Sequence, residues 1–369
     1  MQFLMALLGS IVIAQGDPTG SPGTEASASS ELQVLAFNIL TSGHPPGPNA
    51  DSSLYRSSRQ ERIAQIILDV NPDIVLVQEA SSAQPIHALL QARDPNWNMQ
   101  DGGVRGQMIL ARHELQAVGA NSARVSTPLG PVVVHNVHWE PYPYGPYECQ
   151  KRLIAEAPIN VDEILAISDK GSIYAETYLD VHPALVEGIP VVIGGDFNEP
   201  SHLDWSTEYL EHGADRWVSN PTNTPLKAVV PWKGSRLLTD PDSFSNELDL
   251  EAGVPLPPLI DAFRSLRPDV VRHPGITWTP AYSSKTSDRR PFRAPEDVAT
   301  GSDGPTAVLD RIDIIYASSD LVPIEVEVLG DAGDPSSDRG FDPWPSDHRA
   351  VLARFRRGEP AETSGEVID

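Results

Sequence analysis

The sequence predicts a single α/β domain in which two β-sheets pack face to face and helices cover the outside. Short apolar runs typical of buried strands are scattered along the whole length, and helical segments separate only some of them. No internal repeat or linker-like stretch interrupts residues 31–357. With 369 residues, of which 40% are hydrophobic, the chain is long enough to bury a large core.

The strands are predicted from apolar runs that end in polar turns. Residues 74–77 are wholly apolar, which is typical of a strand buried on both faces. The other predicted strands are residues 32–37, 106–110, 131–137, 190–194, 276–279, 309–316, 321–329 and 350–355.

Helices are predicted at residues 59–68, 85–92 and 149–167 from the spacing of their apolar residues. The chain contains 35 prolines, which favour ordered loops over long helices. Residues 198–261 are therefore expected to be rich in loops, and the polar residues 282–306 to form an insertion.

The two ends of the chain are expected to lie outside this domain. Residues 1–16 have a short apolar core, well below the roughly 20 residues that span a bilayer, and predict a signal peptide. Residues 17–30 predict a flexible linker and residues 358–369 a disordered acidic tail. We expect export to the periplasm or the extracellular space if residues 1–16 are a signal, and a cytoplasmic protein otherwise. No stable membrane insertion is expected.

Charge and cysteine content narrow the function. The net charge of −24 disfavours tight binding of nucleic acid, which depends on Lys and Arg neutralising phosphates. A small phosphate ester remains compatible with it, because a few local groups can balance its charge. The single cysteine, Cys149, excludes an intramolecular disulfide and a zinc site built from several thiolates.

Polar and charged residues recur where the predicted strands end or begin. They are Asn38, Glu79, His138, Asp196, Asn198, Asp347 and His348, and Asp313 lies inside the predicted strand 309–316. A charge beside a buried strand is costly unless it is paired or bound to metal, so we expect these side chains to converge on one site. For each residue taken singly, ordinary turn formation remains the alternative. Carboxylate and amide ligands without thiolates favour Mg²⁺, or Mn²⁺ or Ca²⁺, the ions used in phosphoryl chemistry.

Six short segments, in this order, make the sequence resemble the endonuclease/exonuclease/phosphatase superfamily. They are Phe37-Asn38-Ile39, Val77-Gln78-Glu79, Asn136-Val137-His138, Gly195-Asp196-Phe197-Asn198, Arg311-Ile312-Asp313 and Ser346-Asp347-His348. The resemblance spans residues 32–355. It implies a DNase I-like α/β (α+β) fold, a four-layer sandwich of two mixed β-sheets with helices outside.

The resemblance also implies a role for each site residue. Glu79 would bind the metal directly, with Asn38 and Asp347 supporting the ion or its waters.

The remaining five residues would act on the phosphate. Asp196 would orient and deprotonate the attacking water, and Asn198 would hold that water or a phosphate oxygen. His348 would contact the phosphate, with Asp313 fixing its tautomer. His138 would stabilise charge or protonate the leaving oxygen.

Four further residues are candidates for substrate contact, each with a structural alternative. Tyr142 and Tyr144 could line the mouth of the site or form a packed lid. Arg105 could meet phosphate or be a solvated surface residue. Trp344 could stack on a substrate or pack in the core.

We therefore expect a monomeric, metal-dependent hydrolase of a phosphodiester or phosphomonoester, acting by in-line attack of water on a soluble or headgroup-sized substrate. A secreted or repair-type nuclease acting on DNA or RNA is the alternative. A non-catalytic binding module on the same fold is a third possibility, which the complete set of acidic and imidazole residues disfavours.

Overall fold

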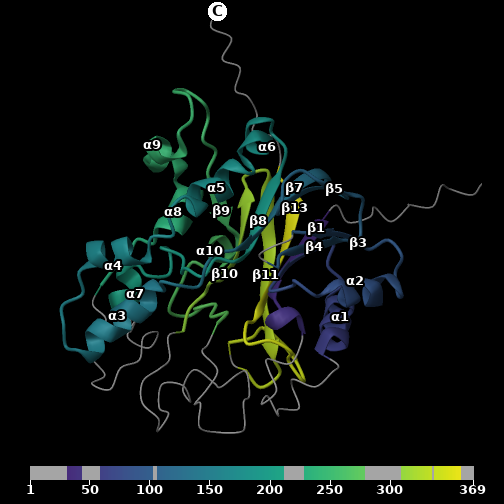
Figure 1. Cartoon of the computed structure of the whole chain (residues 1–369), viewed down its shortest axis with the longest axis horizontal. Coiled ribbons are helices and arrows are strands. Elements are labelled where there is room, and N and C mark those ends of the chain that lie inside the picture. The colour runs from purple at the N-terminus through teal and green to yellow at the C-terminus, as the bar shows by residue number, and fades with distance from the viewer. Residues whose placement is uncertain are drawn as a thin grey trace, which may run out of the picture. The chain divides into compact units, whose positions relative to one another are not determined.

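A computed structural model describes residues 31–43, 59–102, 106–211, 228–278, 309–334 and 336–358. The signal peptide and linker predicted at residues 1–30, the insertion at 282–306 and nearly all of the predicted tail lie outside these residues. In the described part, two β-sheets pack face to face in the centre and helices lie around them (Figure 1).

The first sheet contains seven strands among the described residues, in the order β12-β11-β13-β1-β2-β4-β3. Their bounds are β1 Glu31–Asn38, β2 Ile74–Gln78, β3 Asn98–Asp101, β4 Met108–Ala111, β11 Leu321–Asp331, β12 Arg339–Phe341 and β13 Ala350–Arg357. β1 pairs in parallel with β2 and antiparallel with β13, so the sheet is mixed.

The second sheet contains six strands within the same described ranges, in the order β5-β6-β7-β8-β10-β9. Their bounds are β5 Leu115–Ala117, β6 Ser122–Thr127, β7 Gly130–His138, β8 Val191–Asp196, β9 Leu259–Asp261 and β10 Asp313–Ser318. β7 and β8 are parallel and the other pairs are antiparallel, so this sheet is mixed as well.

Successive side chains of a strand point to opposite faces of its sheet. Apolar side chains therefore form one core between the sheets and one on the outer face of each sheet. On β1, Val34 and Ala36 face the second sheet, whereas Leu35 and Phe37 face the helices α1 (Arg59–Val70) and α2 (Gln84–Gln91). On β8, Val192 points into the core between the sheets. The outer face of the second sheet is covered by α5 (Ile173–Leu179), α6 (His182–Val186) and α8 (Lys233–Thr239).

A fourth apolar cluster lies beside the sheets and includes residues of α3 (Gly145–Ile154) and α4 (Val161–Ser168). Residues 149–167, predicted to be mainly helical, contain parts of two helices, α3 and α4, and Pro158 lies in the break between them. Proline has no N–H to donate and disfavours a helical residue before it, which explains the break.

The remaining described elements are short. They are α7 (Thr207–Glu211), α9 (Ser245–Leu248), α10 (Ala262–Leu266) and the 3-10 turns Thr41–Gly43 and Pro241–Phe244. The strand predicted at residues 276–279 is reduced to isolated bridges from Trp278 to Asp310 and His348. Among the described helices, none is both long and apolar enough to cross a bilayer.

The sheets approach closely where β2 faces β8. A Cβ atom added to Gly194 would lie 2.9 Å from Cδ1 of Leu76, so the backbone of β8 comes into direct contact with a side chain of the opposite sheet. This contact lies near the ends of β2 and β8 that lead into Glu79 and Asp196. The predicted architecture of two mixed sheets packed face to face, with helices outside, is confirmed.

Replacing the buried Leu76 by Ala should lower the free energy of unfolding by about 2–5 kcal/mol, because it leaves a cavity between the sheets. Val118→Ala, at a position 51% exposed, is the matched control and should change stability by less than about 0.5 kcal/mol. Urea unfolding of both variants measures the difference. Equal stability of the two variants would contradict the packing described for Leu76.

Candidate active site

Three neighbouring strands of the second sheet bring His138, Asp196 and Asp313 into one row. β7 and β8 are parallel and end at the same edge, and β10 begins there because it runs antiparallel to β8. The register pairs His138 with Asp196, and Asp196 with Asp313. The strand pairing alone therefore places these three side chains next to one another.

The first sheet presents its polar residues at the same end. β1 and β2 are parallel, and Asn38 at the end of β1 pairs with Gln78, which directly precedes Glu79. β13 is antiparallel to β1, so Asp347 and His348 arrive just before it at this end. The convergence of strand-end residues that the sequence predicted is present in the structure.

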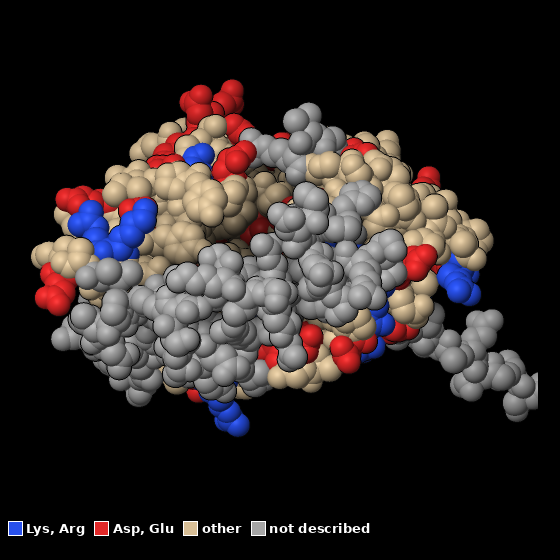
Figure 2. All heavy atoms as spheres, turned by 60° about the horizontal axis from the view of Figure 1, so that its bottom comes forward, with Lys and Arg blue, Asp and Glu red and all other residues tan. Residues whose placement is uncertain are grey.

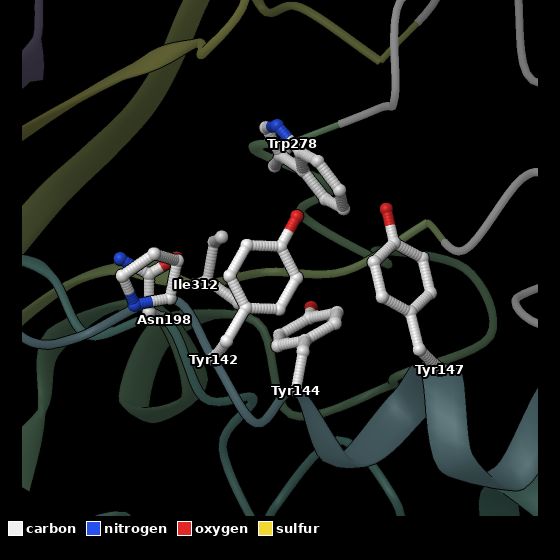
Figure 3. Close-up of a pocket in the computed structure, with 7 residues that line it drawn as sticks. Tyr142, Tyr144, Tyr147, Asn198, Trp278 and Ile312 are labelled. Atoms are coloured by element: carbon white, nitrogen blue, oxygen red, sulfur yellow. The ribbon is translucent and has the colours of Figure 1, made fainter.

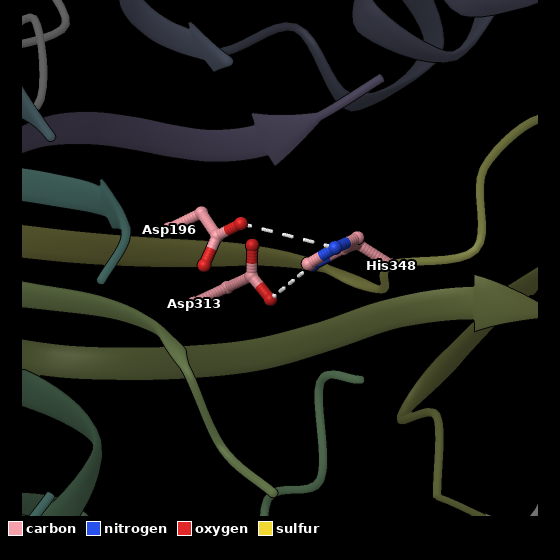
Figure 4. Close-up of side chains that lie close together, drawn as sticks. All are labelled: Asp196, Asp313 and His348. Atoms are coloured by element: carbon pink, nitrogen blue, oxygen red, sulfur yellow. Dashed lines mark hydrogen bonds and ion pairs between the residues drawn. The ribbon is translucent and has the colours of Figure 1, made fainter. Parts of the chain in front are cut away.

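The carboxylate of Asp196 lies at the centre of this group and is only 1% exposed. Its Oδ2 accepts hydrogen bonds from Nδ2 of Asn38 at 3.0 Å and of Asn198 at 3.2 Å, and its Oδ1 accepts one from the backbone N–H of Asn198 at 2.9 Å. Two imidazoles also approach Oδ2: Nε2 of His348 lies at 3.8 Å (Figure 4) and Nε2 of His138 at 3.9 Å. Donors from both sheets thus stabilise the negative charge.

The imidazole of His348 is held by Asp313, as the sequence implied. Nδ1 of His348 lies 2.9 Å from Oδ2 of Asp313, and both side chains are buried. Burial raises the pKa of Asp313 to about 6. Burial by itself lowers the pKa of His348, but the carboxylates of Asp313 and Asp196 outweigh it and raise that pKa well above its usual value. The contact with Asp313 and the raised pKa both favour the protonated imidazole, whose Nε2 faces Asp196.

Two buried side chains join the segment after β1 to the segment before β13. Ser346 donates from Oγ to the carbonyl of Asn38 at 2.6 Å and accepts the backbone N–H of His348 at 3.2 Å. Arg59 donates to the carbonyl of Pro345 at 2.9 Å and to main-chain carbonyls just beyond β1. Sequence reasoning missed Arg59, whose only signal is a position at the start of a helix.

Glu79 and Asp347 form the pair of carboxylates that fits a hard cation. Glu79 adopts the left-handed conformation, with φ 55°, and its Oε2 accepts the backbone N–H of Thr41 at 2.6 Å. Burial raises the pKa of Asp347, the charge of His348 opposes this, and the charge of Glu79 adds to it. Oδ1 of Asp347 is buried without a hydrogen-bond partner among the described residues. A cation would satisfy that oxygen and relieve the repulsion.

A second arrangement of metal-ligating types consists of Asp196, Asp313 and His348, whose ligand atoms lie within 4.8 Å of one another. Here the imidazole already bonds Asp313 through Nδ1 and faces Asp196 through Nε2. The group therefore fits a hydrogen-bonded unit, and Glu79 with Asp347 fits the cation better. Asn38 faces Asp196 through its amide nitrogen, while its Oδ1 accepts the N–H of Leu40 at 3.1 Å.

A pair of buried amides links the two sheets behind the site, and sequence reasoning missed both. Nε2 of Gln78 donates to Oδ1 of Asn136 at 2.7 Å, and Nδ2 of Asn136 donates to the carbonyl of Val77 at 2.9 Å. Both side chains are fully buried. Gly195 makes room for them: at its φ of 140°, an added Cβ would lie 2.1 Å from the carbonyl oxygen of Val137. The sequence signal that could have identified them is their position: Gln78 directly precedes Glu79, and Asn136 lies two residues before His138.

Comparison with known proteins agrees with this geometry. Residues 35–348 match the family model described as the Endonuclease/Exonuclease/phosphatase family. The chain belongs to this family. Its members are hydrolases that act on phosphoester bonds, and they generally use divalent metals. The superfamily resemblance carried by the six short segments is thereby confirmed.

The individual proteins that the chain resembles share only a small part of its sequence. The chain is 27% identical over 352 residues to the uncharacterized protein F14F9.5 of Caenorhabditis elegans, covering 91% of this chain and 94% of that protein. Among solved structures, truncated Caenorhabditis elegans TDP2 is 17% identical with a TM-score of 0.44, covering 88% of this chain and 97% of that one. An endonuclease/exonuclease/phosphatase from Beutenbergia cavernae is 18% identical with a TM-score of 0.43, covering 89% and 72%.

Next to the catalytic group of this family member is a hollow lined by aromatic rings. Tyr142, Tyr144, Tyr147 and Trp278 surround it and Asn198 borders it, and we call it the aromatic hollow (Figure 3). Tyr142 is 69% exposed, whereas Tyr144 is buried. Both tyrosines proposed from sequence therefore border the site, the first at its mouth and the second deep within it. Tyr147 and Trp278 were not among the proposed contacts.

The other two candidate substrate contacts are Trp344 and Arg105. Trp344 is fully buried, stacks on Phe37 with ring centroids 5.1 Å apart and donates Nε1–H to the carbonyl of His348 at 2.7 Å. Its proposed role in substrate contact is therefore wrong, and it supports His348 from the core. Arg105 lies outside the described residues. On the face of the molecule that Figure 2 shows, the surface has a hollow with acidic side chains at its bottom.

The turn that carries Asn198 is anchored by the next residue, Glu199, which is only 4% exposed. Its carboxyl group accepts the hydroxyl of Tyr174 at 2.6 Å and the backbone N–H of Gly234 at 2.7 Å. Burial raises the pKa of Glu199 to about 7, and these hydrogen bonds only partly offset the effect.

Because the pKa of Glu199 is higher in the folded protein than in the unfolded chain, its contribution to stability should be lost as pH rises from about 4.5 to about 7. The difference in unfolding free energy, wild type minus Glu199→Gln, should fall across this range by up to about 3 kcal/mol and then level off. Denaturant unfolding at several pH values measures it. Glu208→Gln, at an exposed glutamate, is the control. A flat Glu199→Gln difference would contradict the raised pKa.

Proposed function

We propose that this protein is a divalent-metal-dependent hydrolase that cleaves a small phosphodiester or phosphomonoester by in-line attack of water. One observation carries the proposal. The carboxylate of Asp196 faces two imidazoles, His348 and His138, beside the carboxylate pair of Glu79 and Asp347. A base, cationic donors and a cation site are what phosphoester hydrolysis requires, whereas a binding module has no need of the set.

The attacking water is assigned to Asp196. Its carboxylate is held in place by Asn38 and Asn198, so it is oriented before any substrate arrives. As the water oxygen bonds to phosphorus, Asp196 accepts its proton, and the bond from phosphorus to the leaving oxygen breaks on the opposite side. Asn198, whose Nδ2 already bonds the carbonyl of Trp139 at 2.9 Å, borders the position of the water or a phosphate oxygen.

The two imidazoles stabilise the charge that develops. His348 is held cationic by Asp313, and its Nε2–H is available to a nonbridging phosphate oxygen. His138 has an 18% exposed side chain and reaches Asp196 from the other side, which suits it to the leaving oxygen. One proton delivered there balances the proton taken from water.

Glu79 and Asp347 would hold Mg²⁺, or Mn²⁺ or Ca²⁺, with Asn38 nearby. When bound, the ion would neutralise charge on the phosphate oxygens. The unpaired Oδ1 of Asp347 supports this assignment.

The net charge of −24 and the acidic side chains at the bottom of the hollow in Figure 2 support a substrate that is small rather than a nucleic acid polymer. We further propose that the protein acts as a monomer. Export remains our proposal for its location and depends on residues 1–16.

Purified protein with Mg²⁺, Mn²⁺ or Ca²⁺ should hydrolyse bis-p-nitrophenyl phosphate or p-nitrophenyl phosphate, and EDTA should stop the reaction until metal is restored. Release of p-nitrophenolate measures it. Digestion of plasmid or oligonucleotide with a steep loss of rate in salt would favour a nuclease instead. Turnover that persists in EDTA would exclude the metal-dependent mechanism.

Asp196→Asn should lower kcat by about a hundredfold or more, because the carboxylate that accepts the proton becomes an amide of the same shape. Asp313→Asn should also lower kcat, since His348 loses the charge that keeps its imidazole cationic. Asp162→Asn, on the exposed face of α4, is the matched control and should leave kcat unchanged. Steady-state kinetics compares the three. Unaltered kcat in Asp196→Asn would remove that residue from the mechanism.

A further inference from the structure

The aromatic hollow is continuous with the proposed catalytic group. Asn198 borders both, and the ring of Trp278 lies 6.4 Å from the imidazole of His348. The hollow is open to solvent at Tyr142. A substituent on the phosphate of a bound substrate would therefore reach it without leaving the site.

The rings that line the hollow pack against one another at steep angles. Tyr144 meets Tyr147 edge to face, at 5.2 Å and an interplanar angle of 79°, and meets Trp278 at 5.9 Å and 81°. Tyr147 and Trp278 are 6.2 Å apart at 65°. A substituent would therefore rest on the solvent-facing side of this cluster, beside Tyr142 (Figure 3). No pair is parallel, so the cluster offers no slot between parallel rings for a planar base.

The electrostatics of the hollow favour a cation. The described residues that line it include no Lys and no Arg. Behind the rings lies Asp310, a buried carboxyl whose Oδ2 accepts the hydroxyl of Tyr144 at 2.6 Å. Burial raises the pKa of Tyr144 and of Tyr147, and Asp310 adds to both effects. The phenols therefore stay neutral, with ring faces that attract positive charge.

We propose that the aromatic hollow binds a quaternary ammonium group, so that the substrate is a soluble phosphate ester carrying one, such as a phosphocholine ester. A trimethylammonium group is compact, rounded, cationic and unable to donate a hydrogen bond, which matches an aromatic surface without such a slot. The inference rests on the proposed phosphoesterase function. A soluble source is favoured because Tyr142 is the only large exposed hydrophobic residue of the described chain that borders the hollow.

Two diesters that differ in a single atom test the charge. One is p-nitrophenyl phosphocholine, and the other is its 3,3-dimethylbutyl isostere, in which carbon replaces the nitrogen. The wild-type protein should show a kcat/KM about tenfold higher for the choline ester, equivalent to about 1.4 kcal/mol of cation–π attraction. Tetramethylammonium should inhibit its hydrolysis competitively.

Two sites in the hollow show whether the rings are responsible. Tyr142→Leu, at an exposed position where folding is not at risk, and Tyr147→Leu should both bring the ratio of the two kcat/KM values close to one. Tyr147→Phe is the matched control, because it keeps the ring face and should retain the ratio. Thermal unfolding confirms that each variant is folded.

The outcomes separate this inference from the proposed function. Hydrolysis of bis-p-nitrophenyl phosphate with equal kcat/KM for the two diesters would overturn the quaternary ammonium site and leave the function standing. Faster turnover of the p-nitrophenyl ester of thymidine phosphate than of the choline ester would assign the hollow to a planar base. Turnover of phosphatidylcholine vesicles but not of glycerophosphocholine would overturn the soluble source. No turnover of any phosphoester with metal would remove the function itself.

Discussion

The site depends on how a buried carboxylate, Asp196, is compensated across the gap between two sheets. An ionised group that is 1% exposed is costly unless polar partners surround it. Asn38 comes from one sheet, Asn198 from the turn after β8, and the two imidazoles from opposite sides. Because these partners belong to different strands, the sheets must pack in one register for the carboxylate to be stabilised. The same requirement orients the base before substrate binds.

A second layer of contacts maintains this register. The amide pair of Gln78 and Asn136 bridges the sheets in the core, while Ser346 and Arg59 tie the segment after β1 to the one before β13. Buried polar groups of this kind rigidify a site when all partners are satisfied. Oε1 of Gln78, Oδ1 of Asp313 and Oδ1 of Asp347 are buried without hydrogen-bond partners among the described residues. The last of these oxygens lies at the place where a cation is proposed, and a bound ion would satisfy it.

The aromatic hollow shows how one family site can acquire its own specificity. The acidic and imidazole residues lie at strand ends, where the fold positions them, whereas Tyr142, Tyr144 and Tyr147 belong to the connection after β7 and the start of α3. Loops can change without disturbing the sheets, so the group next to the phosphate is selected by residues that the catalytic chemistry does not constrain. The described lining contains no Lys or Arg, and Asp310 accepts the hydroxyl of Tyr144, so this setting supports the positively charged substituent that we propose.

The sequence by itself determined the architecture and the residues of the candidate site. Short apolar runs that end in polar turns specify strands, and polar residues at the ends of those runs, such as Asp196 and His348, are visible without coordinates. Inference from the sequence was incomplete for features that depend on packing between distant segments. Pro158 divided a predicted helix, and Trp344 is in the core because Phe37, far away in sequence, covers it. Only the tertiary structure decided that Gln78 meets Asn136 and that Tyr147 and Trp278 share a hollow, because burial and orientation arise from contacts that no local pattern encodes.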